Sequence, residues 1–241
     1  GIPASSIWIS DPQPSAWLSA TGVNLNKSLP DNPAVCIIAV KPQIIFEAVS
    51  NLKGYKQSET LFISIAAGIT LKQLEQAISS DSTIIRAMPN TPSAVGKGIT
   101  ALIGNSAAKN EHILISKILL EKISEVVELE HEDQMDIVTG LSGSGPAYVF
   151  YLIESLTNAG IELGLSKEKA LHLAKATVAG SGALAMSSTE NPSVLRENVT
   201  SPNGTTQAGL EILMDKKDGL GPLIKSTVEA AAKRSKELGN G

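Results

Sequence analysis

Two segments of the sequence combine free backbone amides with hydroxyl side chains, which suits the binding of a small anion. Residues 199–206 read Val-Thr-Ser-Pro-Asn-Gly-Thr-Thr and lead into a helical pattern that starts at about Thr205. The first N–H groups of a helix have no partner inside the helix, and the helix dipole adds partial positive charge there. A carboxylate is therefore the ligand that this loop favours. A capping loop that binds nothing has the same composition.

The second segment is the joint at residues 142–146, which reads Ser-Gly-Ser-Gly-Pro. Pro146 kinks or restarts a helix, and the glycines expose the backbone, so amides beside Ser144 are available to an anion. Residues 140–144 nearly imitate the G-x-S-x-G elbow of serine hydrolases. The fifth residue is Ser, however, and no strand is predicted before it, so we expect no serine hydrolase.

A third group of candidates follows predicted strands. Residues 66–68, Ala-Ala-Gly, present bare backbone on which an extended cofactor can lie, and Lys41 supplies a cation for a phosphate. Both follow the carboxyl ends of predicted parallel strands, the edge at which open α/β folds bind ligands. Each feature alone is commonly a plain turn or a solvated lysine. Their shared position favours a binding site.

The usual fingerprint of a dinucleotide site is not found in the first half of the chain. That fingerprint is G-x-G-x-x-G between the first strand and the first helix. Residues 180–185 fit G-x-G-x-x-A, but helix-favouring residues precede them, so they predict no phosphate site.

Cysteine and histidine chemistry is not expected. The single cysteine, Cys36, lies in the apolar run 35–40, so it forms no intrachain disulfide and is interpreted as a buried structural residue. The three histidines, His112, His131 and His172, fit no short metal-ligand spacing, and we expect no metal.

Composition bounds the class of protein. The 241 residues are 42% hydrophobic and 18% charged, which is typical of a folded globular chain. A net charge of −4 without long like-charge blocks argues against a nucleic-acid partner. No apolar run approaches the ~18 residues of a membrane span, and the N-terminus has no signal pattern. We expect a cytoplasmic protein with no membrane partner.

The elements that must position these residues alternate between strands and helices in the first half. Helical signals occupy residues 43–52 and 71–79, the latter after the N-cap candidate Thr70, and a further stripe lies around 115–123. Short apolar runs at residues 7–9, 35–40, 61–65 and 83–86 are typical of strands buried on both faces of a parallel sheet. Further strands are predicted at residues 98–103 and 126–129. The layout predicts an α/β domain.

Strand signals stop at about residue 130, and helical periodicity continues almost to the C-terminus. We therefore expect two domains, residues 1–133 and 134–241. The second contains small-residue stretches at 180–183 and 230–232, which let helices approach closely, either within one subunit or between subunits.

Five segments in order resemble the pyrroline-5-carboxylate reductases: residues 39–42, 64–70, 85–92, 139–148 and 199–206. The resemblance covers essentially the whole chain. It implies a Rossmann-like N-terminal domain and an all-helical C-terminal dimerisation domain, in a homodimer or a larger ring such as a decamer. It also implies reduction of 1-pyrroline-5-carboxylate to L-proline, the last step of proline synthesis, with NADPH as the cofactor and NADH as the alternative.

The resemblance also implies residue roles. Ser10 and Asp11 would face the adenosine ribose, where Asp11 accepts from the 2′-OH and repels a 2′-phosphate. This indicates tolerance of NADH, and the choice between NADPH and NADH stays open. The imine would lie between the nicotinamide and the helical domain, and the catalytic Thr206 hydroxyl would bond its ring nitrogen. The other cofactor-binding candidates are Asn26, Val40, Lys41, Pro42, Ala66, Ala67, Gly68 and Asn198. The substrate-binding candidates are Ser144, Val199, Ser201, Gly204, Thr205 and Thr206.

The chain departs from the family pattern in two places. The family's first strand and glycine-rich turn are missing before Gly1, so the chain is either truncated or defective in holding the cofactor. Asn203 replaces the first glycine of Ser-Pro-Gly-Gly-Thr-Thr, and asparagine tolerates the left-handed conformation that the loop needs. The alternatives are a related imine or β-hydroxyacid reductase, and a non-catalytic oligomeric remnant.

Overall fold

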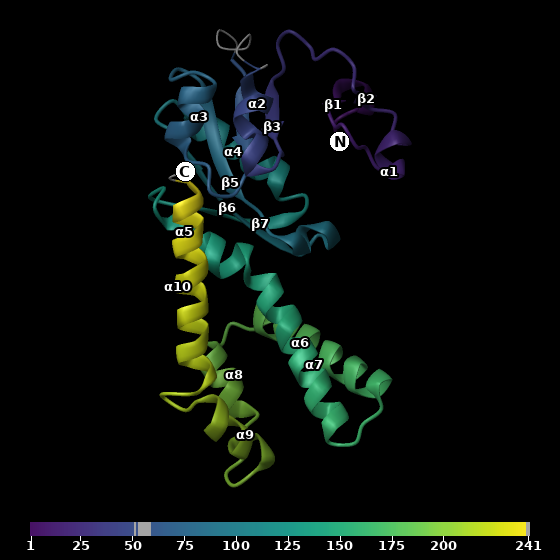
Figure 1. The fold of residues 1–241 in the computed structure, drawn as a ribbon, viewed down its shortest axis with the longest axis vertical. Coiled ribbons are helices and arrows are strands. Elements are labelled where there is room, and N and C mark those ends of the chain that lie inside the picture. The colour runs from purple at the N-terminus through teal and green to yellow at the C-terminus, as the bar shows by residue number, and fades with distance from the viewer. Residues whose placement is uncertain (51, 53–58, 240–241) are drawn as a thin grey trace.

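The structure is a computed structural model that describes residues 1–50, 52 and 59–239. Its strand-rich first half and helical second half occupy opposite ends of an elongated molecule (Figure 1). The main sheet has five strands in the order β3-β4-β5-β6-β7. Their bounds are Val35–Ile38, Leu61–Ser64, Thr83–Met88, Gly98–Gly104 and Ser124–Glu128. The prediction of an α/β first half followed by an all-helical second half is confirmed.

Two strands of the main sheet run opposite to the other three. Strands β3, β4 and β5 are parallel, but β6 runs antiparallel to β5, with Met88 opposite Ala101, and β7 is parallel to β6. The parallel arrangement predicted for the runs at 35–40, 61–65 and 83–86 is confirmed, whereas β6 and β7, which were predicted only as further strands, run in the opposite direction. Residues 89–97 join β5 to β6 through a single 3-10 helix, η4 (Thr91–Val95), which is too short for the crossover that a parallel pair requires.

The predicted first strand is present but lies outside the main sheet. Strand β1 (Trp8–Ile9) pairs in parallel with β2 (Asn24–Leu25) in a separate two-stranded sheet, beside the short helix α1 (Ala16–Ser19). The pattern did not predict β2, because two residues are too few to show periodicity.

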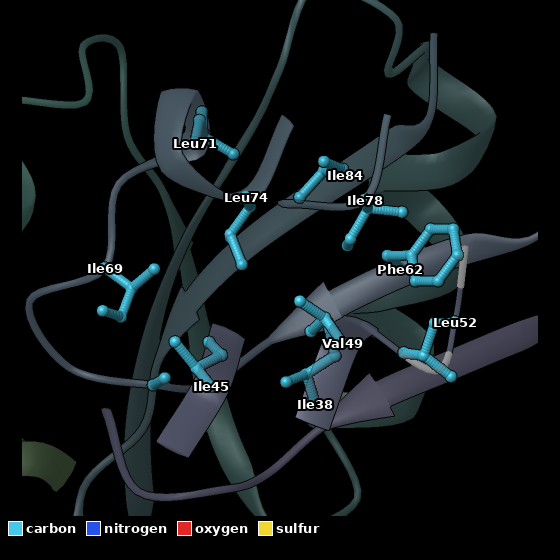
Figure 2. Close-up of a cluster of buried hydrophobic side chains, with 11 residues drawn as sticks. Ile38, Ile45, Val49, Leu52, Phe62, Ile69, Leu71, Leu74, Ile78 and Ile84 are labelled. Atoms are coloured by element: carbon cyan, nitrogen blue, oxygen red, sulfur yellow. The ribbon is translucent and has the colours of Figure 1, made fainter. Parts of the chain in front are cut away.

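Helices cover both faces of the main sheet, as continuous apolar strands require. On one face lie α2 (Ile45–Ser50) and α3 (Leu71–Ala77), over the apolar cluster drawn in Figure 2. Helix α4 (Asn110–Leu120) covers the other face, where Leu61, Ile63 and Ile85 are buried. Each such side chain contributes roughly 1.5–3 kcal/mol on burial.

Two of the predicted helices near this core can be compared with the structure at their first and last residues. Thr70 caps α3 as predicted, since its Oγ1 accepts from the Gln73 amide at 3.2 Å and its own amide donates to Gln73 Oε1 at 2.9 Å. The helix predicted over residues 43–52 starts as a 3-10 turn, η2 (Pro42–Ile44), and continues as α2. Residue 51 lies outside the described residues.

The helical half begins with α5 (Gln134–Val138) and a π-helical turn, η5 (Thr139–Gly143). Helices α6 (Gly145–Glu162) and α7 (Lys167–Ser187) form a hairpin. The chain then forms α8 (Pro192–Asn198), α9 (Thr205–Leu213) and the long α10 (Leu220–Gly239), which returns to the sheet (Figure 1). Within the described parts of the chain, no helix combines the length and apolar character needed to cross a membrane.

The two small-residue stretches have different surroundings. A Cβ added at Gly180 or Gly182 meets nothing within 4 Å, so these glycines of α7 face open space in a single chain. Ala232 of α10, by contrast, packs against Gly140 of the π-turn. Close packing within one subunit therefore accounts for residues 230–232 but not for the glycines of α7.

Candidate active site

The carboxyl ends of β3 and β4 bring two predicted cofactor segments to one edge of the sheet. Val40, Lys41 and Pro42 follow β3, and Lys41 is exposed at the N-terminus of η2. Residues 66–68 follow β4, where Ala66 is buried and Gly68 has a φ of 76° that a residue with a side chain rarely adopts. We call this edge, residues 40–42 and 66–68, the cofactor edge.

The end of α10 supports the cofactor edge, a contact that the sequence did not predict. The Gln73 side chain donates from Nε2 to the Gly239 carbonyl at 2.8 Å. A Cβ added at Gly68 would lie 3.2 Å from the Cβ of Leu238. The C-terminus of the last helix is thus packed directly on the turn after β4.

A buried ion pair joins the sheet to the segment between the two halves. Arg86 Nη1 of β5 lies 2.7 Å from Glu132 Oε1, with 4% of the Arg86 side chain exposed and 30% of Glu132. The same carboxylate oxygen accepts from the Leu71 amide, the first of α3, at 2.7 Å. An arginine within a buried apolar run was the signal for such a partner, but nothing local identified Glu132.

The predicted joint at residues 142–146 contains the end of the π-turn η5 and the start of α6, where Pro146 stands in the first turn as predicted. The Ser144 amide donates to the Thr139 carbonyl at 2.8 Å, which is the i to i+5 bond of a π-helix. The π-turn lies against the carboxyl end of β5, because the Met88 side chain touches Gly143 and Asn90 Nδ2 donates to the Ser142 carbonyl at 3.1 Å.

This geometry changes what Ser144 can offer a ligand. Its amide, which the sequence left free for an anion, is already bonded within the turn. Its hydroxyl has no hydrogen-bond partner among the described residues and is half-buried. Any contact of Ser144 with a substrate therefore falls to the hydroxyl.

Ser10, Asp11 and Asn26 lie at the carboxyl ends of β1 and β2. Asn26 adopts a left-handed φ of 52°, and its side-chain amide pairs with the Asp11 backbone through bonds of 2.9 and 2.8 Å. Asp11 Oδ1 accepts from the Gln13 amide at 2.8 Å. The Asn26 amide is thus occupied in fixing Asp11, and the Asp11 carboxylate has a defined orientation.

The loop at residues 199–206 has the conformation that its sequence predicts. Asn203 has a φ of 62°, confirming that asparagine takes the left-handed position, and α9 begins at Thr205. The Asn203 amide donates to Gln207 Oε1 at 2.7 Å, and the Gly204 amide to the Ser201 carbonyl at 3.0 Å. Gly204 has no side chain to cap α9, so the first-turn amides from Thr205 onward are the ones available to an anion.

One chain does not bring this loop to the cofactor edge. Helices α8 and α9 lie at the end of the molecule opposite the sheet (Figure 1). The 20 residues of α10, which separate that end from Gly68, span about 30 Å. Asn198, a predicted cofactor residue, is at the end of α8 and donates to Glu190 Oε2 at 3.2 Å. Thr206 is exposed.

Reactive thiol and metal chemistry find no support at the site. Burial raises the pKa of the Cys36 thiol to about 11, so at neutral pH the group is protonated and a poor nucleophile. Among the residues that the structure describes, no group of three His, Cys, Asp or Glu side chains is arranged to hold a metal ion.

Known proteins resemble this chain in both halves. Residues 132–238 match the family described as pyrroline-5-carboxylate reductase dimerisation. Pyrroline-5-carboxylate reductase 1 of Bacillus subtilis is 41% identical over 204 residues, which are 85% of this chain and 68% of the relative. The Pseudomonas aeruginosa pyrroline-5-carboxylate reductase is 36% identical over 244 residues, covering 99% of this chain and 89% of the relative.

Solved structures of pyrroline-5-carboxylate reductases superpose on this chain over nearly its whole length. The Coxiella burnetii pyrroline-5-carboxylate reductase superposes with a TM-score of 0.90 at 33% identity, covering 98% of this chain and 89% of that one. The Plasmodium falciparum pyrroline carboxylate reductase, solved with NADP bound, gives a TM-score of 0.85 at 31% identity, with 98% and 88% covered. The sequence resemblance is thereby confirmed, and the chain belongs to the pyrroline-5-carboxylate reductase family.

Proposed function

We propose that this chain reduces 1-pyrroline-5-carboxylate to L-proline by hydride transfer from NAD(P)H. The observation that carries the proposal is membership of the reductase family across both halves of the chain. A dinucleotide-type sheet edge and a helical loop suited to a carboxylate are the two parts that this reaction needs, and both are present.

The cofactor edge would hold the dinucleotide. Lys41 is an exposed cation placed to meet a phosphate, and the bare backbone at residues 66–68 allows close approach. Ser10 and Asp11 would face the adenosine ribose, where the oriented Asp11 carboxylate suits a 2′-OH better than a 2′-phosphate. When bound, the cofactor supplies the hydride.

The helical half would bind and protonate the imine. The amides at the start of α9 attract the substrate carboxylate, aided by the helix dipole to the extent of ~0.3–1 kcal/mol. With a neutral imine, the Thr206 hydroxyl donates its proton to the ring nitrogen as the imine carbon accepts hydride, and then regains a proton from water. An iminium substrate already carries that proton, and its N–H donates to the Thr206 hydroxyl oxygen instead, so neither route needs a carboxylate or a histidine. The Ser144 hydroxyl supplies a further polar contact.

The two parts would come from different subunits. Because α10 is about 30 Å long and the loop lies at the end of the molecule opposite the sheet, we infer that the loop serves the cofactor edge of a partner chain (Figure 1). The described α6 and α7 expose large apolar side chains, including Phe150, Tyr151 and Met186, and α7 exposes the unpacked Gly180 and Gly182. A homodimer that buries this hairpin satisfies both observations, and rings of dimers such as a decamer extend it. A cytoplasmic location without membrane or nucleic-acid partners stays a prediction.

An assay of NADH and NADPH oxidation that depends on added 1-pyrroline-5-carboxylate, with proline measured as the product, tests this function. We expect both cofactors to be oxidised, NADH with the lower KM because of Asp11. A protein that oxidises neither cofactor with this imine, or prefers a β-hydroxyacid in the reverse direction, contradicts the proposal.

A further inference from the structure

Asn90 makes two side-chain hydrogen bonds that bridge the strand-rich half and the π-turn. Its Oδ1 accepts from the Ile99 amide at the start of β6 at 2.9 Å, and its Nδ2 donates to the Ser142 carbonyl at 3.1 Å. Asn90 is also the N-cap residue of η4, yet its side chain makes no capping bond there. Both ends of the amide are instead committed to neighbouring elements, so its orientation is fixed.

The Ser142 carbonyl needs this outside donor. In an α-helix its partner would be the N–H four residues later, and that position is Pro146, which has none. A backbone carbonyl left without a partner in a half-buried turn is unfavourable. Asn90 supplies from another element the hydrogen bond that the helix cannot make.

Apart from its packing on α10, the π-turn meets the strand ends directly through Asn90 and the Met88 side chain. Gly140 packs against α10, since an added Cβ would lie 2.7 Å from the Val228 carbonyl oxygen, and its own carbonyl accepts from the Tyr148 hydroxyl at 3.1 Å. These contacts lie within the helical half. Among the described residues, the Asn90 bond is the only hydrogen bond from the π-turn to the strand-rich half, and Met88 adds only apolar contact.

We propose that Asn90 is a positioning residue of the reductase. By tying Ser142 to the carboxyl end of β5, it sets where the neighbouring Ser144 hydroxyl lies relative to the cofactor edge, and hence where the imine is held against the nicotinamide. This inference rests on the proposed function.

Asn90→Ala tests the proposal, with Asn105→Ala as the matched control. Asn105 has the same kind of bonds in the same sheet, since its Oδ1 accepts from the Ile84 amide at 3.1 Å and its Nδ2 donates to the Ser82 carbonyl at 2.9 Å. Both variants should lower Tm. Only Asn90→Ala should raise the KM for the imine, by ~10-fold, because a small displacement of a positioning group is costly. The dissociation constant for NADH, from fluorescence titration, should stay unchanged.

A second substitution separates positioning from simple stabilisation. Asn90→Ala combined with Pro146→Ala restores an N–H four residues after Ser142, so Tm should recover in part while the KM for the imine stays raised. The positioning role is wrong if both the Tm and the KM for the imine return towards wild-type values in the double variant. It is also wrong if Asn90→Ala leaves this KM unchanged while the wild type is active. Neither result contradicts the proposed function. A wild-type protein that does not reduce the imine overturns the proposed function as well.

Discussion

Thr206→Val should lower kcat for imine reduction by ~100-fold or more, the low end for loss of an aligned proton-transfer partner. Valine matches threonine in shape but cannot donate to the ring nitrogen, so hydride transfer to the neutral imine would leave an amide anion without a proton source. Thr206 is exposed at the start of α9 in the single chain, so the change should leave Tm nearly unaltered. Steady-state kinetics with saturating cofactor measure the effect.

Two variants control this prediction. Thr206→Ser keeps the hydroxyl and should retain most of the activity. Thr205→Val removes the adjacent hydroxyl from the same helix start and should change kcat far less than Thr206→Val. Near-native kinetics in Thr206→Val would remove this residue from the mechanism.

Glu132→Ala should destabilise the fold by about 3 kcal/mol, because it leaves the Arg86 guanidinium buried without its counter-charge. The same change removes the acceptor of the Leu71 amide at the start of α3. Chemical denaturation of wild type and variant measures the difference in free energy of unfolding.

Glu237→Ala is the matched control, since Glu237 pairs at 3.0 Å with Arg234 on the surface, where both side chains are about half or more exposed. Exposed pairs contribute ~0–1 kcal/mol, so this variant should be close to wild type. Equal, small losses in both variants would show that the buried pair contributes no more to stability than an exposed one.

Much of the sheet could be predicted because its strands are short continuous apolar runs. Phe62 and Ile63 are both fully buried, on opposite faces, which is what such a run indicates. The reversed direction of β6 and β7 was not predicted, because a run of apolar residues does not encode orientation. The nine-residue connection, positions 89–97, does encode it, since it is too short to cross over.

The local shapes of the site could be predicted, but its assembly could not. The left-handed conformation of Asn203 and the capping of α3 by Thr70 follow from neighbouring residues. The bonds from Asn90 to Ser142 and from Gln73 to Gly239 join positions far apart in the sequence. Nothing in the periodicity of either partner identifies the other.

The sequence also does not show how far the 199–206 loop lies from the cofactor edge. The sequence indicates a carboxylate loop and a cofactor edge, and the length of α10 keeps them apart in one chain. Whether they meet is therefore a property of the oligomer rather than of any local pattern.

Mixing two defective chains tests the shared site most directly. Ala67→Asp should block the cofactor edge by adding bulk and negative charge, and Thr206→Val should disable the loop. Neither variant alone should be active. Co-expressed in equal amounts, they form mixed dimers in which one site combines the intact edge of one chain with the intact loop of the other. Random pairing then predicts recovery of about a quarter of the wild-type activity. Mixed dimers, verified by tag-based purification, that show no recovery would mean that each chain builds its own site, contrary to this account.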